Sequence, residues 1–130
     1  MAEQLEGIRW GRAILGCLLV EVVLGLVAWP FMDSNATLDM LIPPASFLVT
    51  MLVVIWLFRR AARPVANGVA TGLASVVLYL LLMGVALLVV PDQVNLSQSL
   101  GVPYLAAHAL KVLGGAAGGW RLERRRATPA

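Results

Sequence analysis

Two side chains of opposite charge, Glu21 and Lys111, lie within otherwise apolar stretches of the sequence. If these stretches cross a membrane, each charge costs from about 2.5–3.5 kcal/mol to far more, and such residues usually pair or line an ion or proton pathway. An isolated carboxylate or ammonium at that depth would favour its neutral form, whereas a close pair lets both groups stay charged. The chemistry that these residues could provide is therefore a structural ion pair or a site for a proton or a cation.

The two charges fall at a similar depth when distance is counted from the arginines that border their stretches. Glu21 lies nine residues after one such arginine, Lys111 ten residues before another, and Thr50 nine residues before a third. With a helix rise of about 1.5 Å per residue, the three depths are about 13.5, 15 and 13.5 Å. We therefore expect the three side chains to share one level near the middle of a membrane.

Polar residues also recur on single helix faces. Tyr104, His108 and Lys111 follow the spacing i, i+4, i+7 in the last apolar stretch, and Ser75 and Tyr79 follow i, i+4 in the third. These faces should point toward one another and leave the apolar faces for lipid. The predicted intramembrane polar cluster consists of Glu21, Thr50, Ser75, Tyr79, Tyr104, His108 and Lys111.

Two roles are open for this cluster. In the first, Glu21 and Lys111 form a structural ion pair that joins the first and fourth helices, or two subunits. In the second, Glu21 carries a proton or a cation, Lys111 tunes it and His108 acts as a relay. His108 has no second histidine, cysteine or carboxylate at i+3 or i+4, so we expect a packed, hydrogen-bonded histidine and no metal or haem ligand. No catalytic residue and no cofactor is predicted.

The composition indicates the elements that must position these residues. Of 130 residues, 60% are hydrophobic and 13% are charged, against about 45–50% and about 25% in soluble domains. A water-soluble enzyme is therefore excluded, and a membrane-spanning helix needs about 20 apolar residues. The predicted spans are residues 13–31, 41–58, 65–90 and 100–120. We expect an all-α, antiparallel up-down bundle of four transmembrane helices, with no segment outside it long enough for a catalytic domain.

The distribution of basic residues predicts the orientation of the bundle. Every Lys and Arg except Lys111 lies in the N-terminal tail, in residues 59–63 or in the C-terminal tail, and the other two loops hold none. The positive-inside rule then places both termini in the cytoplasm, here of a bacterial inner membrane. The predicted topology anchors are Arg59, Arg60, Arg63, Arg121, Arg124, Arg125 and Arg126. Since the net charge of +3 comes from helix ends, no nucleic acid is expected as a partner; anionic lipid is an alternative contact for the C-terminal arginines.

Small residues are concentrated in the third and fourth stretches, where they allow membrane helices to approach closely. The glycines expected at helix contacts are Gly68, Gly72, Gly114, Gly115, Gly118 and Gly119. The second stretch offers only Ser46 and Thr50 on such a face, so we expect its helix to be the most exposed to lipid. Pro43, Pro44 and Pro103 are expected in the first turns of their helices, where proline is tolerated.

A shift of 61 residues aligns several glycines, prolines and arginines of the two halves of the chain. Residues 7–63 and 68–124 would then be duplicated helical hairpins related by an axis along the membrane normal. Chance similarity between two apolar sequences is the alternative interpretation.

Two resemblances to known families can be stated. The run Glu21-Val22-Val23 in the middle of the first helix resembles the small multidrug resistance transporters, which implies that Glu21 is a functional glutamate. The strong basic bias and the absence of that family's third- and fourth-helix signatures depart from the pattern, and Lys111 would compete with a cationic substrate. Most of the chain, including the closing segment at residues 114–119, is similar to uncharacterised four-helix bacterial membrane proteins, a similarity that implies no activity.

Taken together, the sequence predicts a non-enzymatic membrane protein with an accessory, assembly or interaction role. Its expected partners are the lipid bilayer and either further copies of itself or a larger membrane protein. The alternative is a small proton-coupled transporter or a channel-like oligomer in which Glu21 is the proton or cation site.

Overall fold

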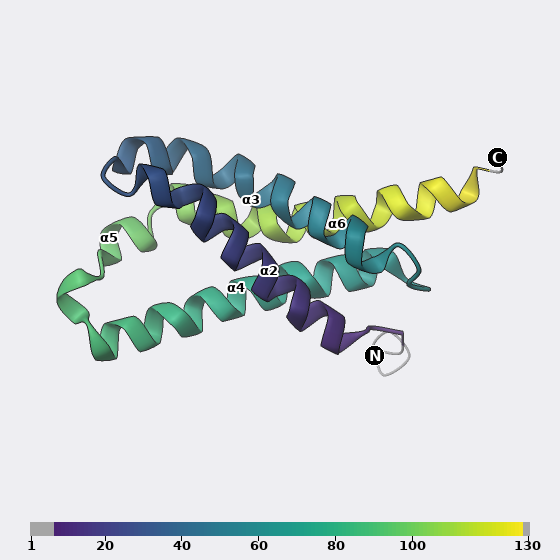
Figure 1. Cartoon of the computed structure of the whole chain (residues 1–130), viewed down its shortest axis with the longest axis horizontal. Coiled ribbons are helices and arrows are strands. Elements are labelled where there is room, and N and C mark those ends of the chain that lie inside the picture. Colours follow the sequence, from purple (N-terminus) through teal and green to yellow (C-terminus); the bar gives the residue numbers. More distant parts are fainter. Residues whose placement is uncertain (1–6, 129–130) are drawn as a thin grey trace.

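The computed structural model describes residues 7–128, and within that part every regular element is helical (Figure 1). The elements in chain order are α2 (Trp10–Ala28), η1 (Trp29–Phe31), α3 (Asn35–Phe58), α4 (Pro64–Val89), η2 (Pro91–Gln93), α5 (Leu96–Ser99) and α6 (Val102–Ala127). The all-helical prediction is confirmed, since the described residues contain no strand.

Three of the helical segments are long and apolar enough to cross a membrane, namely Trp10–Phe31, Asn35–Phe58 and Pro64–Val89. The fourth long helix, α6, has 26 residues but is less apolar because it contains His108, Lys111, four glycines and a basic last turn. Three helices therefore give the chain its membrane character, and α6 is as long as α4, the longest of the three.

The start of α3 differs from the predicted boundary at residue 41. Ser34 is the N-cap, and its hydroxyl accepts a hydrogen bond from the backbone N–H of Thr37 at 3.4 Å. This cap allows the polar residues that follow it to form the first turns of the helix, which begins at Asn35. Pro43 and Pro44 consequently lie inside α3, so the expectation that they occupy its first turn is wrong.

Close glycine contacts hold α6 against its neighbours. A Cβ atom on Gly68 or on Gly115 would overlap the carbonyl oxygen of the other glycine, and a Cβ on Gly72 would lie 2.7 Å from the carbonyl oxygen of Lys111. Gly114 and Gly118 touch the backbone of α3, and Gly119 touches the first turn of α4. All six glycines selected from the sequence thus lie where two helix backbones meet.

The expectation that the second predicted helix is the most lipid-exposed is wrong. One face of α3 is buried from Leu38 to Phe58, and Ser46 and Thr50 are fully buried on it. In the most apolar part of α3, 28% of residues are buried, against 11% in that of α4. The reason lies on the neighbouring helix, because Gly114 and Gly118 of α6 let the two backbones approach.

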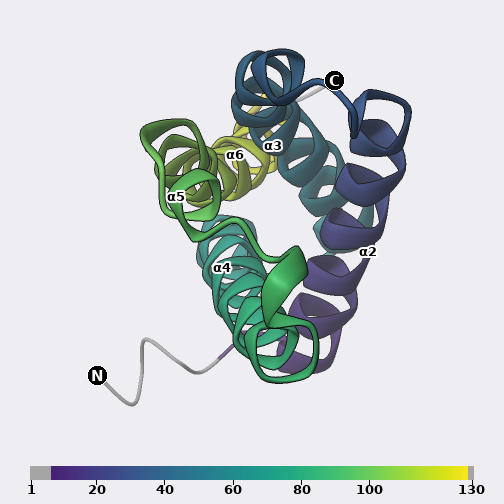
Figure 2. The same ribbon diagram turned by 90° about the vertical axis from the view of Figure 1, so that its left-hand side faces the viewer.

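The bundle is tightly closed at one end only. We call this the basic end; it comprises the start of α2, the turn at residues 59–63 and the end of α6. Buried residues of α4 extend from Pro64 to Ser75, and none is found further along the helix. Beyond that point α4 diverges from α3 and α6, and the segment with η2 and α5 bridges the gap, as the two ribbon views agree (Figures 1 and 2). α2 crosses the bundle obliquely, close to α4 at the basic end and to α3 at the opposite end (Figure 2).

Candidate functional site

The structure places Glu21 of α2 and Lys111 of α6 in direct contact. Lys111 Nζ lies 2.6 Å from Glu21 Oε1, and the two side chains are 3% and 16% exposed. The hydroxyl of Ser75 on α4 donates a second hydrogen bond to the same carboxylate oxygen. One atom of Glu21 therefore joins three helices that are distant in sequence.

Local packing explains why Lys111 points into the bundle. The carbonyl group of Lys111 lies against Gly72, and Gly115, one turn further along α6, touches Gly68. These contacts fix the rotation of α6 relative to α4, because a side chain at either glycine of α4 would force the helices apart. The face that carries Lys111 is thereby turned toward Glu21.

Aromatic residues extend the polar cluster from the pair toward the opposite end. The Nζ atom of Lys111 lies 5.3 Å from the ring centroid of Tyr79, within the range of a cation–π contact. The Tyr79 ring is 4.5 Å from the His108 ring and 6.4 Å from the Tyr104 ring, measured between centroids. Of the seven residues predicted for the cluster, six form this connected group.

Thr50 is the member that does not join. It is fully buried, but its hydroxyl donates to the carbonyl oxygen of Ser46 in the same helix at 2.7 Å. The predicted depth was therefore not sufficient, because the hydroxyl of Thr50 bonds within its own helix and not to the pair.

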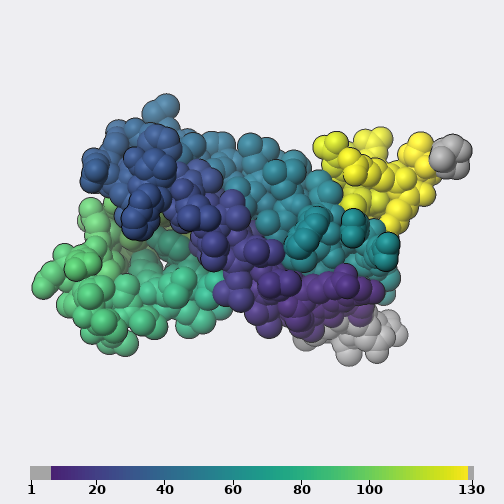
Figure 3. Space-filling view, viewed as in Figure 1, coloured from purple at the N-terminus to yellow at the C-terminus, as the bar shows by residue number. Residues whose placement is uncertain are grey.

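A cavity of about 180 Å³ lies beside the ion pair, where the helices begin to diverge. Its polar lining residues are Glu21, Ser46, Tyr79, Tyr104, His108 and Lys111. Among residues 7–128, no hydrogen-bond partner exists for the buried hydroxyl of Ser46 or for either ring nitrogen of His108. The His108 ring thus lines a polar cavity, and the expectation that it is hydrogen-bonded stays a prediction. A cavity of this size can hold several water molecules, each of which needs about 30 Å³ and polar partners. The space-filling view shows the molecule hollowed where α2 and α4 part (Figure 3).

Asn67 is a buried polar residue that the sequence analysis did not select. Its Oδ1 accepts from the backbone N–H of Arg9 at 2.7 Å, and its Nδ2 donates to the carbonyl oxygens of Arg63 at 2.7 Å and Gly7 at 3.1 Å. These bonds attach the segment before α2 to the start of α4. The sequence did contain a pattern that could have identified Asn67, because polar residues recur every four positions on one helix face, at Asn67, Thr71 and Ser75.

The predicted anchor arginines gather at the basic end, where some also make specific contacts. Arg126 donates from Nη1 to the carbonyl oxygen of Ala61 at 2.6 Å and from Nη2 to that of Arg59 at 2.7 Å. Arg124 lies over the Trp120 ring at 4.8 Å from its centroid. The end of α6 is thereby tied to the turn between α3 and α4.

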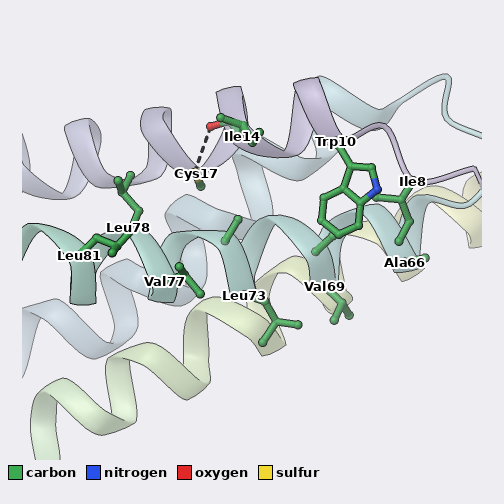
Figure 4. A pocket seen from close by; sticks show the side chains of 12 residues that line it. Ile8, Trp10, Ile14, Cys17, Ala66, Val69, Leu73, Val77, Leu78 and Leu81 are labelled. Carbon is green, nitrogen blue, oxygen red and sulfur yellow. Dashed lines mark hydrogen bonds between the residues drawn. The ribbon is translucent and has the colours of Figure 1, made fainter. Parts of the chain in front are cut away.

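A further cavity, of about 650 Å³, is an apolar groove between α2 and α4 (Figure 4). Aliphatic side chains such as Leu73 and Val77 line it, together with Trp10. Cys17 also lines the groove, and its thiol donates to the carbonyl oxygen of Ile14 in the same helix at 3.0 Å. The groove offers hydrocarbon contacts and no polar chemistry.

The part of the chain that the structure describes contains no group of three His, Cys, Asp or Glu side chains placed to hold a metal ion. Comparison with protein-family models, with curated proteins and with solved structures finds no match to this chain. What the polar cluster around Glu21 and Lys111 can do therefore follows from the positions and contacts of its own residues.

Proposed function

We propose that the chain is an integral protein of a bacterial inner membrane that crosses it four times, with both termini in the cytoplasm. The three apolar helices and the 26-residue length of α6 support four spans, and the lipid bilayer is the first partner. The arginines at the basic end support the orientation, because basic residues are retained on the cytoplasmic side. Exposed tryptophans lie at both ends, with Trp10, Trp56 and Trp120 at the basic end and Trp29 at the other, as in an interfacial aromatic belt.

Within this membrane protein, the role we propose is non-enzymatic, that of an accessory or assembly subunit whose ion pair is structural. The observation that carries this role is the convergence of Lys111 and Ser75 on one oxygen of Glu21. A buried charge pair with additional hydrogen bonds fixes which helices touch one another. The connections between the long helices are short, so the surface available for function is the apolar exterior of the bundle. Such a surface suits a larger membrane protein or further copies of the chain.

Purification in a mild detergent tests the accessory role. We expect the 13.9-kDa chain to elute in a complex of defined mass, either with a larger membrane protein or as a homo-oligomer, because the proposed role requires a protein partner. Mass analysis of the intact complex identifies which partner is present. Elution as a single chain free of other proteins, at expression levels close to the natural one, contradicts the proposal.

The cavity beside the ion pair favours a second candidate function, a proton or cation site based on Glu21. The cavity brings unpartnered polar atoms of Ser46 and His108 to the carboxylate, and it lies on the side where the helices diverge. In this candidate, solvent from the outer side of the membrane reaches Glu21 through the cavity. His108 is placed to relay protons, since neutral imidazole carries both a donor and an acceptor nitrogen.

Cysteine accessibility tests this second candidate. In a Cys17→Ser background, Ala28→Cys and Ala107→Cys introduce thiols that line the cavity, and Thr71→Cys introduces one in the closed part of the bundle. We expect a membrane-impermeant thiol reagent added from the outer side to label the two cavity positions and to leave Thr71→Cys unlabelled. If the cavity positions react no faster than Thr71→Cys, no aqueous path reaches Glu21 and the transport candidate is wrong.

A further inference from the structure

We propose that the basic end of α6, together with Met51 of α3, forms a binding site for the phosphate headgroup of an anionic phospholipid. The site is a cavity of about 470 Å³ lined by Met51 of α3, by Ala117, Trp120, Arg121, Arg124 and Arg125 of α6, and by Thr128, which directly follows α6. This proposal rests on the membrane placement proposed above and is independent of the role of the Glu21–Lys111 pair.

The charge of the cavity matches a phosphate. Three arginines are among its lining residues, and the guanidinium group of arginine binds phosphate oxygens through paired, parallel hydrogen bonds. The adjacent Arg126 is directed elsewhere, because it donates to the carbonyl oxygens of the turn at residues 59–63. Glu123 lies two residues from both Arg121 and Arg125, on another face of α6, and it does not line the cavity.

The surroundings of the cavity favour a lipid over a soluble phosphate. Leu113, Ala117, Trp120 and Arg124 follow i, i+4, i+7, i+11 and so form one line along α6. Leu113 and Trp120 are exposed, and Trp120 contacts Arg124 through its ring face. An acyl chain can follow the apolar part of this line while its headgroup reaches the arginines, an arrangement of basic pocket and adjoining hydrocarbon that suits anionic lipid headgroups.

A role as topology anchors does not by itself explain this geometry. The positive-inside effect depends on the number of basic residues near a helix end and needs no particular arrangement. Here Met51 of α3 joins residues of α6 in lining one cavity, and Arg124 lies over the Trp120 ring at 4.8 Å from its centroid. The arrangement of the three arginines is the feature that points to a ligand.

The test is native mass spectrometry of the full chain in detergent, titrated with phosphatidylglycerol or phosphatidylcholine. We expect the intact protein to retain phosphatidylglycerol preferentially, and the triple variant Arg121→Gln/Arg124→Gln/Arg125→Gln to bind it about 100-fold more weakly, or about fivefold for each charge removed. The control Arg9→Gln/Arg12→Gln/Arg60→Gln removes the same charge at the basic end, where Arg12 and Arg60 line a separate, smaller cavity of about 180 Å³, and it should bind as the parent does.

Three results would overturn the proposal. Equal retention of both lipids by the parent protein shows no headgroup recognition, and equal loss in the two triple variants shows an effect of net charge alone. Displacement of the lipid by millimolar inorganic phosphate shows a free-phosphate site. The first and third results are read on the parent protein, so they stand even if a variant fails to fold. Binding in detergent does not depend on orientation, and a C-terminal reporter fusion tests the membrane placement separately.

Discussion

Replacing Lys111 with methionine should destabilise the protein by about 3–5 kcal/mol, the cost of removing one partner from a buried ion pair. The Lys111 side chain is 3% exposed and supplies the only positive charge in contact with Glu21 among the described residues. Methionine fills a similar volume, so the loss would be electrostatic and would reflect a largely buried carboxylate left without its cationic partner. The measurement is the free energy of unfolding by sodium dodecyl sulfate in mixed micelles.

The matched control for this substitution is Leu113→Met, two residues further along the same helix on an exposed face. It introduces the same side chain without touching the pair, and surface substitutions of this kind usually change stability by less than about 0.5 kcal/mol. A Lys111→Met variant as stable as Leu113→Met would mean that the ion pair contributes nothing to the fold.

The second large effect is expected at Gly68. Its backbone touches that of Gly115, and a Cβ atom there would overlap the Gly115 carbonyl oxygen. Because backbone atoms cannot rotate away as a side chain can, Gly68→Ala must separate α4 from α6, at a cost of about 1–3 kcal/mol or more. The same separation would move Gly72 away from Lys111, and so would weaken the ion pair. The unfolding measurement described for Lys111→Met applies here too.

The control for Gly68→Ala is Gly84→Ala on the same helix. A Cβ atom at Gly84 meets nothing within 4 Å, so only the intrinsic helix propensity changes, which favours alanine by about 1 kcal/mol. The two substitutions are chemically identical and should act in opposite directions. Equal effects would show that the close α4–α6 contact does not exist in the folded protein.

The sequence was sufficient to predict the long helices and the contact between the two buried charges. The length of the apolar stretches and the arginines that border them indicate where each helix lies. The similar depth and opposite charge of Glu21 and Lys111 predict that the two side chains meet. The boundary of α3 was missed because the hydroxyl of Ser34 makes the polar residues after it helical. That effect is local, and a capping pattern could have shown it.

Other features depend on contacts between helices and could not be obtained from any one helix. The burial of α3 follows from glycines on α6, and the cavity at His108 follows from the divergence of α4 beyond Ser75. Periodicity shows which residues share a face, but it does not show how far apart two faces lie. The duplication of residues 7–63 and 68–124 stays a prediction.

The most direct test of the account is the coupling free energy between Glu21 and Lys111, measured with Glu21→Gln, Lys111→Met and the double variant. Because the double variant leaves no unpaired charge, it should regain most of the stability and yield that Glu21→Gln or Lys111→Met loses, with a coupling energy above about 1 kcal/mol. Additive effects, within about 0.5 kcal/mol, or single variants as stable as the parent, would contradict an ion pair that holds α2, α4 and α6 together.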